Sequence, residues 1–159
     1  MTILTRGDIE VFFQPATVAD INALARLIRR YFAFDHIAFD AAAIRSGLKA
    51  MFKDKSAGQA FLIATESKPI GYTILANSFD LEFGGPVAVM TDLYLEPEYR
   101  RLGIGKKTIR FLEQLCRKKG MCALEFQVER DNTDALSFYK RQGFVAYNRI
   151  PMSKRLRAR

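Results

Sequence analysis

The fold of this chain is decided by the stretch Arg100-Arg101-Leu102-Gly103-Ile104-Gly105. It follows an apolar run that ends in Leu93-Tyr94-Leu95, and a helix-forming run begins inside it. Glycines at the start of a helix let backbone N–H groups approach a ligand without a side chain in the way. Those N–H groups have no partner inside the helix, and the helix dipole makes that end partly positive. A strand, a basic glycine-rich turn and a helix start therefore predict a site for a ligand that carries a pyrophosphate.

The chain has 159 residues, a length that suits one domain with one core. Apolar residues make up 49% and charged residues 26%, which is the balance of an ordinary globular protein. No apolar run approaches the roughly 20 residues that span a membrane, so we expect no membrane partner. The cysteines, Cys116 and Cys122, are expected to be free thiols, which fits a cytoplasmic location.

The net charge of +8 comes largely from three places: Arg26, Arg29 and Arg30, the stretch 100–119, and the tail 154–159. Such an excess suits a nucleic acid, a membrane surface or an anionic ligand. Aromatic residues do not interleave with these cations, so the pattern does not favour a nucleic-acid partner. For the first and third clusters, solvated helix faces and a basic tail are the alternative.

The spacing of apolar residues predicts ten elements in the order βααβββαβαβ. Thr17 and Asp20 form a capping box for the first helix, and Asp40 is expected to cap the second. The predicted strands are 10–14, 60–66, 70–77, 87–95, 122–128 and a last strand or hairpin from 144, and the predicted helices run to about 32, from 40 to about 52, from 104 to about 119 and from 132 to 142.

Two motifs of the chain resemble those of the GCN5-related N-acetyltransferase family. Residues 91–105, TDLYLEPEYRRLGIG, look like the family's acetyl-coenzyme A motif, a strand followed by Arg/Gln-x-x-Gly-x-Gly/Ala. The second motif comprises Asn132 to Ala135, Phe138-Tyr139 and Gly143-Phe144. The order of elements also agrees, from about residue 10 to residue 156.

The resemblance implies an α/β (α+β) fold in which about four helices flank a mixed central sheet of six to seven strands. It implies a single acetyltransferase domain over residues 1–159, with a core of about 10–156 and a basic tail at 154–159. By analogy with the family, a homodimer is possible.

Rival motifs fail on particular residues. A nucleotide-binding P-loop needs Ser or Thr after its Gly-Lys pair, but Lys107 follows Gly105-Lys106. A dinucleotide fingerprint needs a third glycine where Thr108 stands. His36 is the sole histidine, so the sequence predicts neither a histidine-centred triad nor a metal site.

The resemblance implies that acetyl-coenzyme A lies in a gap between the strand 87–95 and the strand 122–128. Its pantetheine would pair with the backbone of Leu93, Tyr94 and Leu95 like an added strand. The N–H groups that would hold its pyrophosphate belong to Arg101, Leu102, Gly103, Ile104, Gly105 and Lys106. Side chains of Arg100, Arg101 and Lys106 would add charge at the rim. The alternative is that the two glycines only shape a tight turn.

The expected acceptor is a primary amine. A lysine-type amine has a pKa near 10.4, so its neutral form at pH 7 costs roughly 4–5 kcal/mol. A base can offset part of that cost. Asp92 is the candidate base, because it resembles the carboxylate that many family members place on this strand; the alternative is a purely structural hydrogen bond.

Further roles also follow from the resemblance. Tyr139 matches the family's tyrosine and is the candidate acid that protonates the departing thiolate, unless it only packs. Asn132 is expected to bind the pantetheine, to cap its helix, or to do both. Gln127 stands where the branch that acetylates ribosomal-protein N-termini tends to have a glutamate, and a neutral amide cannot act as a base. Glu125 and Glu129 are weaker candidates than Asp92.

The loops at residues 33–40 and 79–85 mix carboxylates with aromatic rings, which favours a small cationic amine as the acceptor. The candidate acceptor-binding residues are Phe34, Asp35, His36, Glu82 and Gln127. Other functions remain open: a peptide N-acetyltransferase, a non-catalytic acyl-CoA sensor, or a nucleic-acid or ribosome-associated module that uses the basic tail.

Overall fold

A computed structural model describes residues 9–157. The described residues divide into two compact units, of which the first ends at Phe126 and the second begins at Gln127. Among the described residues, none of the helices has both the length and the apolar character that crossing a membrane requires.

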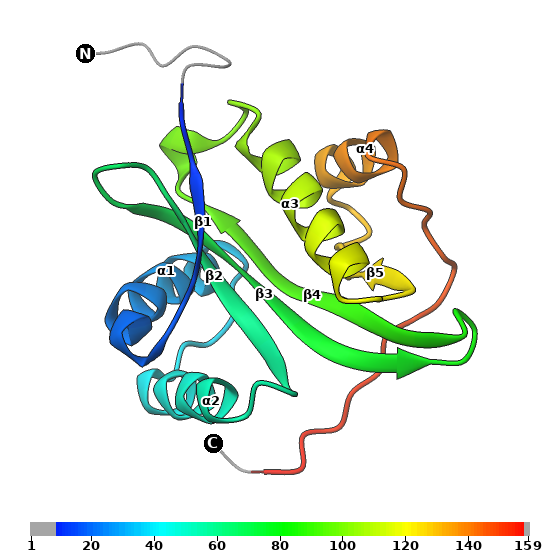
Figure 1. The fold of residues 1–159 in the computed structure, drawn as a ribbon, viewed down its shortest axis with the longest axis horizontal. Coiled ribbons are helices and arrows are strands. Elements are labelled where there is room, and N and C mark those ends of the chain that lie inside the picture. Colours follow the sequence, from blue (N-terminus) through cyan, green and yellow to red (C-terminus); the bar gives the residue numbers. More distant parts are fainter. Residues whose placement is uncertain (1–8, 158–159) are drawn as a thin grey trace. The chain divides into compact units, whose positions relative to one another are not determined.

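The first unit is built on a five-stranded sheet with the order β1-β2-β3-β4-β5 (Figure 1). The first three pairings are antiparallel, and β4 pairs with β5 in parallel. The strands are β1 Phe12–Pro15, β2 Gly58–Ala64, β3 Pro69–Asp80, β4 Gly85–Leu95 and β5 Ala123–Glu125. The helices of this unit are α1 Ile21–Phe34, α2 Ala41–Lys53 and α3 Ile104–Lys118, with short 3₁₀ turns η1 Val18–Asp20 and η2 Pro97–Tyr99.

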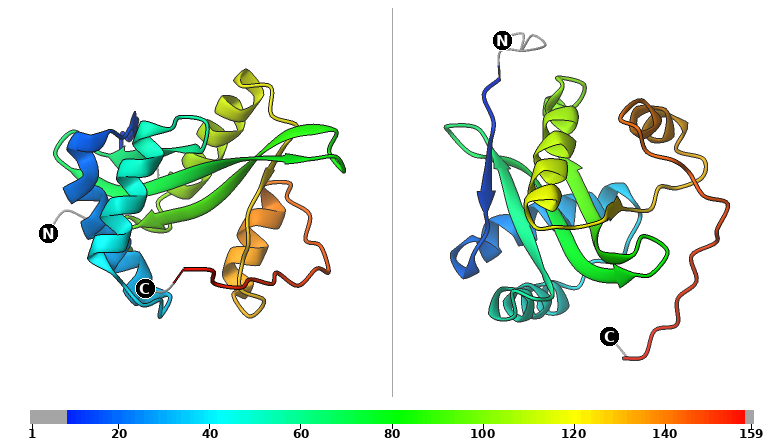
Figure 2. Two further views of the ribbon diagram at one scale, coloured as in Figure 1. Left: turned by 90° about the horizontal axis from the view of Figure 1, so that it is seen from below. Right: turned by 45° about the vertical axis from the view of Figure 1, so that its right-hand side comes forward.

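Helices cover both faces of the sheet, with α1 and α2 on one side and α3 on the other (Figures 1 and 2). Alternate residues of a strand point to opposite faces, so the strands contribute to two cores. Tyr72 and Tyr94 pack in the core beneath α1 and α2. Ile63 and Ile70 pack with Ile104 of α3 on the opposite face.

The predicted helix starts are confirmed in detail. The Thr17–Asp20 capping box forms, although it caps η1, and α1 begins directly after η1 at Ile21. Asp40 Oδ1 accepts a hydrogen bond of 3.0 Å from the N–H of Ala43 and so caps α2. These caps depend only on neighbours three residues away, which is why the sequence reveals them.

The second unit contains α4, Thr133–Arg141, capped by Asn132, whose side chain accepts from the N–H of Ala135 at 3.1 Å. The predicted strand or hairpin from residue 144 is wrong for the described part of the chain, where residues 144–157 form no strand. The sheet accordingly has five strands instead of six or seven. Val145, Tyr147 and Ile150 are 74%, 53% and 77% exposed. Their apolar side chains are therefore not buried, as they would be in a strand packed in the core.

Candidate active site

The C-terminal half of β4 has one open edge. Pairing between β4 and β5 covers Val87 to Val89, and among the described strands none pairs with that edge beyond this point. Thr91 is a β-bulge, since Ile74 pairs with Asp92 and Leu75 pairs with Met90. A bulge bends a strand and increases its twist, so it can direct β4 away from β5. The backbone of residues 93–95 is therefore open to an extended ligand.

The glycine-rich turn leads directly into α3. Gly103 is the residue before the helix and has a φ of +83°, a left-handed conformation that glycine adopts without strain. No described side chain caps α3, and its first helical hydrogen bond runs from the N–H of Lys107 to the carbonyl of Gly103. The N–H groups of the first turn can therefore donate to an anion.

The turn is anchored from both sides. Leu102 packs into the core beneath α3, and Ile104 is 1% exposed. Arg101 has a φ of +61°, which is uncommon for a residue with a side chain. Where residues with negative and positive φ alternate in a short segment, successive backbone N–H groups point toward one place. This is the geometry of an anion-binding nest.

Arg100 is folded back against the end of β4. Its Nε donates to the carbonyl of Leu95 at 2.8 Å. Its guanidinium lies 4.6 Å from the ring centre of Phe34 and 5.4 Å from that of Tyr94. Arg100 thus links α1 to the turn, and the Leu95 carbonyl already has a donor.

Glu96, between β4 and η2, is held by two arginines of α1. Its Oε1 accepts from Arg30 and, at 3.2 Å, from Arg26. The residue is only 4% exposed. Burial by itself would raise the pKa of Glu96, but the hydrogen bonds and charges of Arg30 and Arg26 outweigh burial and hold it below its usual value.

Asp92 lies on the α1–α2 face of the sheet and is half buried. The Tyr72 hydroxyl donates to its Oδ2 at 2.7 Å, and the Thr73 hydroxyl donates to its backbone carbonyl at 2.9 Å. Burial, and then the Asp92 charge, raise the pKa of Tyr72, so this phenol remains a donor. A carboxylate offers about four lone-pair positions, which leaves Asp92 able to accept from a further donor.

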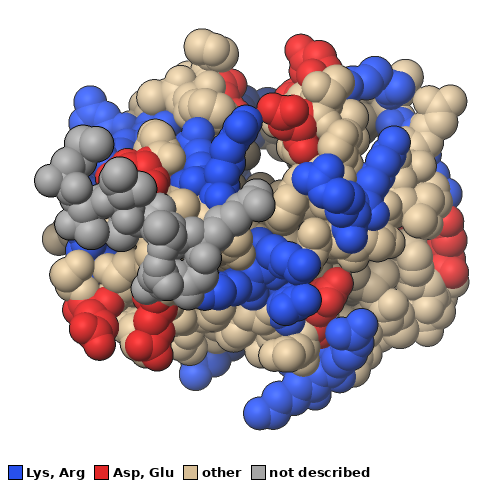
Figure 3. All heavy atoms as spheres, turned by 90° about the horizontal axis from the view of Figure 1, so that it is seen from above, with Lys and Arg blue, Asp and Glu red and all other residues tan. Residues whose placement is uncertain are grey.

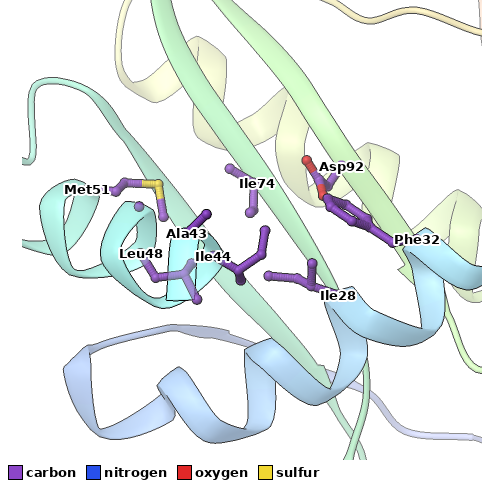
Figure 4. A pocket seen from close by; sticks show the side chains of 9 residues that line it. Ile28, Phe32, Ala43, Ile44, Leu48, Met51, Ile74 and Asp92 are labelled. Carbon is purple, nitrogen blue, oxygen red and sulfur yellow. The ribbon is translucent and has the colours of Figure 1, made fainter. Parts of the chain in front are cut away.

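A pocket of about 220 Å³ lies between α1, α2 and the sheet, with Asp92 in its wall (Figure 4). Ile28 and Phe32 of α1 line one side, and α2 lines the other with Ile44 and Met51. Ile74 of β3 forms part of the floor. The pocket therefore combines an apolar wall with the carboxylate of Asp92.

The acceptor-binding residues predicted from the loops lie apart from this pocket wall. Phe34 lies under the Arg100 guanidinium, and Asp35 and His36 are exposed at the end of α1. Glu82 is in the β3–β4 turn, beyond the Asp80–Gly85 pair. Position 80 is six residues from the Ile74–Asp92 pair, or roughly 20 Å along the strand. The structure does not bring Glu82 to Asp92, so its role stays a prediction.

The remaining predicted residues belong to the second unit. Gln127 is exposed at the start of this unit. Asn132 caps α4, which was one of the two roles expected for it. Tyr139 packs edge-on against Phe138 and Phe144, with ring centres 5.0 and 5.9 Å apart. Burial raises the pKa of Tyr139 to about 12. Its phenol is therefore protonated at neutral pH.

Positive side chains surround the start of α3. Lys106 and Lys107 are exposed in the first turn of the helix, and Arg110 is exposed one turn later. Seen from the end of the molecule where α3 begins, Lys and Arg side chains are more prominent than Asp and Glu (Figure 3). This charge adds to the helix dipole and favours an anionic ligand.

Sequence reasoning missed the pocket. Ile28, Ile44 and Met51 stand at helical spacing, which identifies the buried face of a helix but not a gap in it. The available signal was Gly47, which occupies the same face of α2 three residues after Ile44, where a large side chain would close the gap.

Comparison with known proteins identifies the fold and family. Over 130 residues the chain is 28% identical to the uncharacterized N-acetyltransferase YhfO of Bacillus subtilis, which covers 81% of this chain and 86% of that protein. It is 34% identical over 70 residues to a spermidine N(1)-acetyltransferase of Thermoplasma acidophilum, 44% of each chain. A solved structure of the aminoglycoside N-acetyltransferase AAC(6')-Iy in complex with CoA has the same fold, with a TM-score of 0.79 at 15% identity, covering 97% of this chain and 99% of that one.

The family model of the acetyltransferase (GNAT) family matches residues 21–144, which is most of the chain. The resemblance drawn from the two motifs is thereby confirmed, and with it the predicted α/β fold class. The chain belongs to the GNAT family of acetyltransferases and is an acyltransferase.

Proposed function

We propose that this protein transfers the acetyl group of acetyl-coenzyme A to the primary amine of a small cationic acceptor by direct attack. The proposal rests above all on β4, which carries Asp92 in the wall of a pocket and continues from an open edge into the uncapped start of α3. The spermidine acetyltransferase relative supports a small amine as the acceptor.

The residues present suit acetyl-coenzyme A, which when bound supplies the acetyl group as a thioester. The open edge of β4 at Leu93 to Leu95 would hold the pantetheine amides, although Arg100 already donates to the Leu95 carbonyl. First-turn N–H groups of Ile104 and Gly105, with the charge of Lys106, would hold the pyrophosphate.

We assign the two proton transfers to Asp92 and Tyr139. Asp92 takes a proton from the ammonium, so that the nitrogen can form its bond to the acetyl carbon. As that bond forms, the carbon–sulfur bond breaks, and the sulfur leaves with the electron pair. Tyr139, whose pKa burial raises to about 12, is protonated at pH 7 and gives its proton to the sulfur. The acetylated nitrogen releases its second proton, which restores the Tyr139 phenol through solvent.

A thiol-release assay with acetyl-coenzyme A and a panel of amines tests this proposal. In Asp92→Asn, we expect turnover to fall by about 10²- to 10⁴-fold, because general-base catalysis has that size. Acetyl-coenzyme A should still bind, as measured by calorimetry. Asp54→Asn, at an exposed carboxylate after α2, is the matched control and should retain activity.

Tight binding of acetyl-coenzyme A by the wild-type protein without acetyl transfer to any amine would contradict the proposal and favour an acyl-CoA sensor. Transfer to peptide N-termini in preference to small amines would favour a peptide N-acetyltransferase.

The proposed location is the cytoplasm. Cys116 is buried in α3 and Cys122 is exposed before β5, and both are free thiols, as the sequence predicts. Free thiols are typical of reducing compartments. Fractionation of cells that express the tagged chain tests this location.

A further inference from the structure

The pocket beside Asp92 differs from a site for a polycation. Apart from Asp92, its wall consists of apolar side chains and Gly47. A second ammonium placed against that wall would find no polar partner there, and each part of its water that it lost would cost free energy. An apolar stem would instead gain free energy from the surface it buries.

The carboxylate has a fixed position at one end of the apolar wall. Tyr72, which is fully buried, donates to Oδ2 of Asp92 at 2.7 Å and limits the movement of the side chain. In Figure 4, Asp92 lies beside Phe32, and the apolar side chains of α2 lie on the far side of Ile28 and Ile74. Charge is therefore confined to one end of the pocket.

The size of the pocket is set partly by Gly47 in the middle of α2. A Cβ built at Gly47 has no other atom within 4 Å, so the position faces open space. Glycine within a helix costs roughly 0.5–1 kcal/mol relative to alanine. An exposed glycine that also lines the pocket keeps this side of it open.

We propose that the acceptor is a monoamine with an apolar alkyl or arylalkyl stem. The stem lies between α1 and α2, and the ammonium pairs with Asp92. A cavity of about 150 Å³ lined by Leu, Ile and Phe can hold benzene, so about 220 Å³ accommodates a ring with a short chain. This inference deepens the proposed function and rests on it for the role of Asp92.

The first test is an acceptor series assayed by thiol release: n-propylamine to n-octylamine, 2-phenylethylamine, and the diamines of equal length with spermidine. We expect kcat/KM to rise about fourfold per methylene, which corresponds to about 0.8 kcal/mol, until the pocket is full. Each diamine should be at least tenfold poorer than the monoamine of equal length. A flat series, or a preference for spermidine, would overturn the inference while leaving the enzyme proposal intact.

The second test fills the pocket from α2. In Gly47→Leu, we expect the preference for hexylamine over propylamine to fall at least tenfold, with acetyl-coenzyme A affinity retained. Ala50→Leu, at an exposed position of the same helix outside the pocket, is the matched control and should keep the preference. An unchanged preference in Gly47→Leu would contradict the inference.

Calorimetric titration with hexylamine separates the two proposals. Binding to the wild type that Gly47→Leu abolishes, without turnover of any amine, would support the pocket assignment and refute the enzyme proposal. Absence of hexylamine binding to the wild type would refute the pocket assignment, whatever the turnover.

Discussion

Glu96 shows how a single buried charge is kept ionised. Arg26 and Arg30 reach it from α1, and their side chains are about half exposed, so water shares in balancing the charges. The residue lies one position beyond β4, immediately before the turn that leads to α3. Its ion pairs connect α1 to the segment that we propose binds the pyrophosphate.

We expect Glu96→Gln to lower the free energy of unfolding by about 1–3 kcal/mol at pH 7, because the two arginines lose a charged acceptor. The folded pKa of Glu96 lies below its unfolded value of about 4.3, so this stabilisation is present above that value and is lost as pH falls through the folded pKa. Urea unfolding at pH 7 and at pH 3 measures the difference. A destabilisation as large at pH 3 as at pH 7 would contradict the ion-pair explanation, and Glu98→Gln, at an exposed neighbour, is the control.

Tyr72 is expected to position Asp92. Tyr72→Phe keeps the packed ring but removes the donor to Oδ2, so the carboxylate can rotate. We expect kcat to fall about ten- to hundredfold, since small displacements of a catalytic group have costs of that size. Acetyl-coenzyme A affinity should not change. Tyr99→Phe, on the opposite face of the sheet, should retain kcat; equal losses in both variants would argue against a positioning role.

Residues were predictable where their function depends on near neighbours in sequence. Asp40 and Asn132 cap their helices as expected, since a cap needs a donor three residues away. The partners of Asp92 were not predictable in the same way. Tyr72 is 20 residues away in sequence and meets Asp92 only through the β3–β4 register, and that register includes a bulge.

At the scale of elements, the β3–β4 hairpin determines where the site lies. It places Ile74 beside Asp92, and its bulge at Thr91 lies two residues beyond the last pair of β4 with β5 at Val89. The predicted strands 70–77 and 87–95 correspond to this hairpin. The predicted length of β3 was too short, because the strand runs to Asp80. The predicted strand 122–128 is only Ala123–Glu125, because its neighbour β4 stops pairing at Val89.

Gly71 is required by the close approach of β3 and β4. A Cβ at this position would lie 2.3 Å from the carbonyl oxygen of Tyr94, a backbone atom that cannot move independently. We expect Gly71→Ala to destabilise the protein by about 3 kcal/mol, a melting temperature lower by roughly 6–12 °C. Gly47→Ala, which meets open space in a helix, is the control and should raise the melting temperature slightly. A neutral Gly71→Ala would contradict the β3–β4 register.

At the scale of the whole molecule, the charge of +8 has two possible uses. We propose that the positive charge at the start of α3 attracts an anionic ligand, while the tail 154–159 carries four positive residues. Described tail residues up to Arg157 are exposed. The single domain expected from chain length stays a prediction.

We expect deletion of residues 154–159 to leave kcat/KM within about twofold of the wild type, because none of the residues to which we assign a role lies in this tail. Thiol release and thermal unfolding measure the effect. Loss of activity on deletion, with strongly salt-dependent binding of nucleic acid by the full chain, would instead support a nucleic-acid function for the tail.

The most direct test of the central claim is a crystal structure of the protein with acetyl-coenzyme A. We predict that pyrophosphate oxygens lie within about 2.7–3.2 Å of the N–H groups of Ile104, Gly105 or Lys106, with the pantetheine along Leu93 to Leu95. Acetyl-coenzyme A bound elsewhere, or no binding at saturating concentration, would contradict the account.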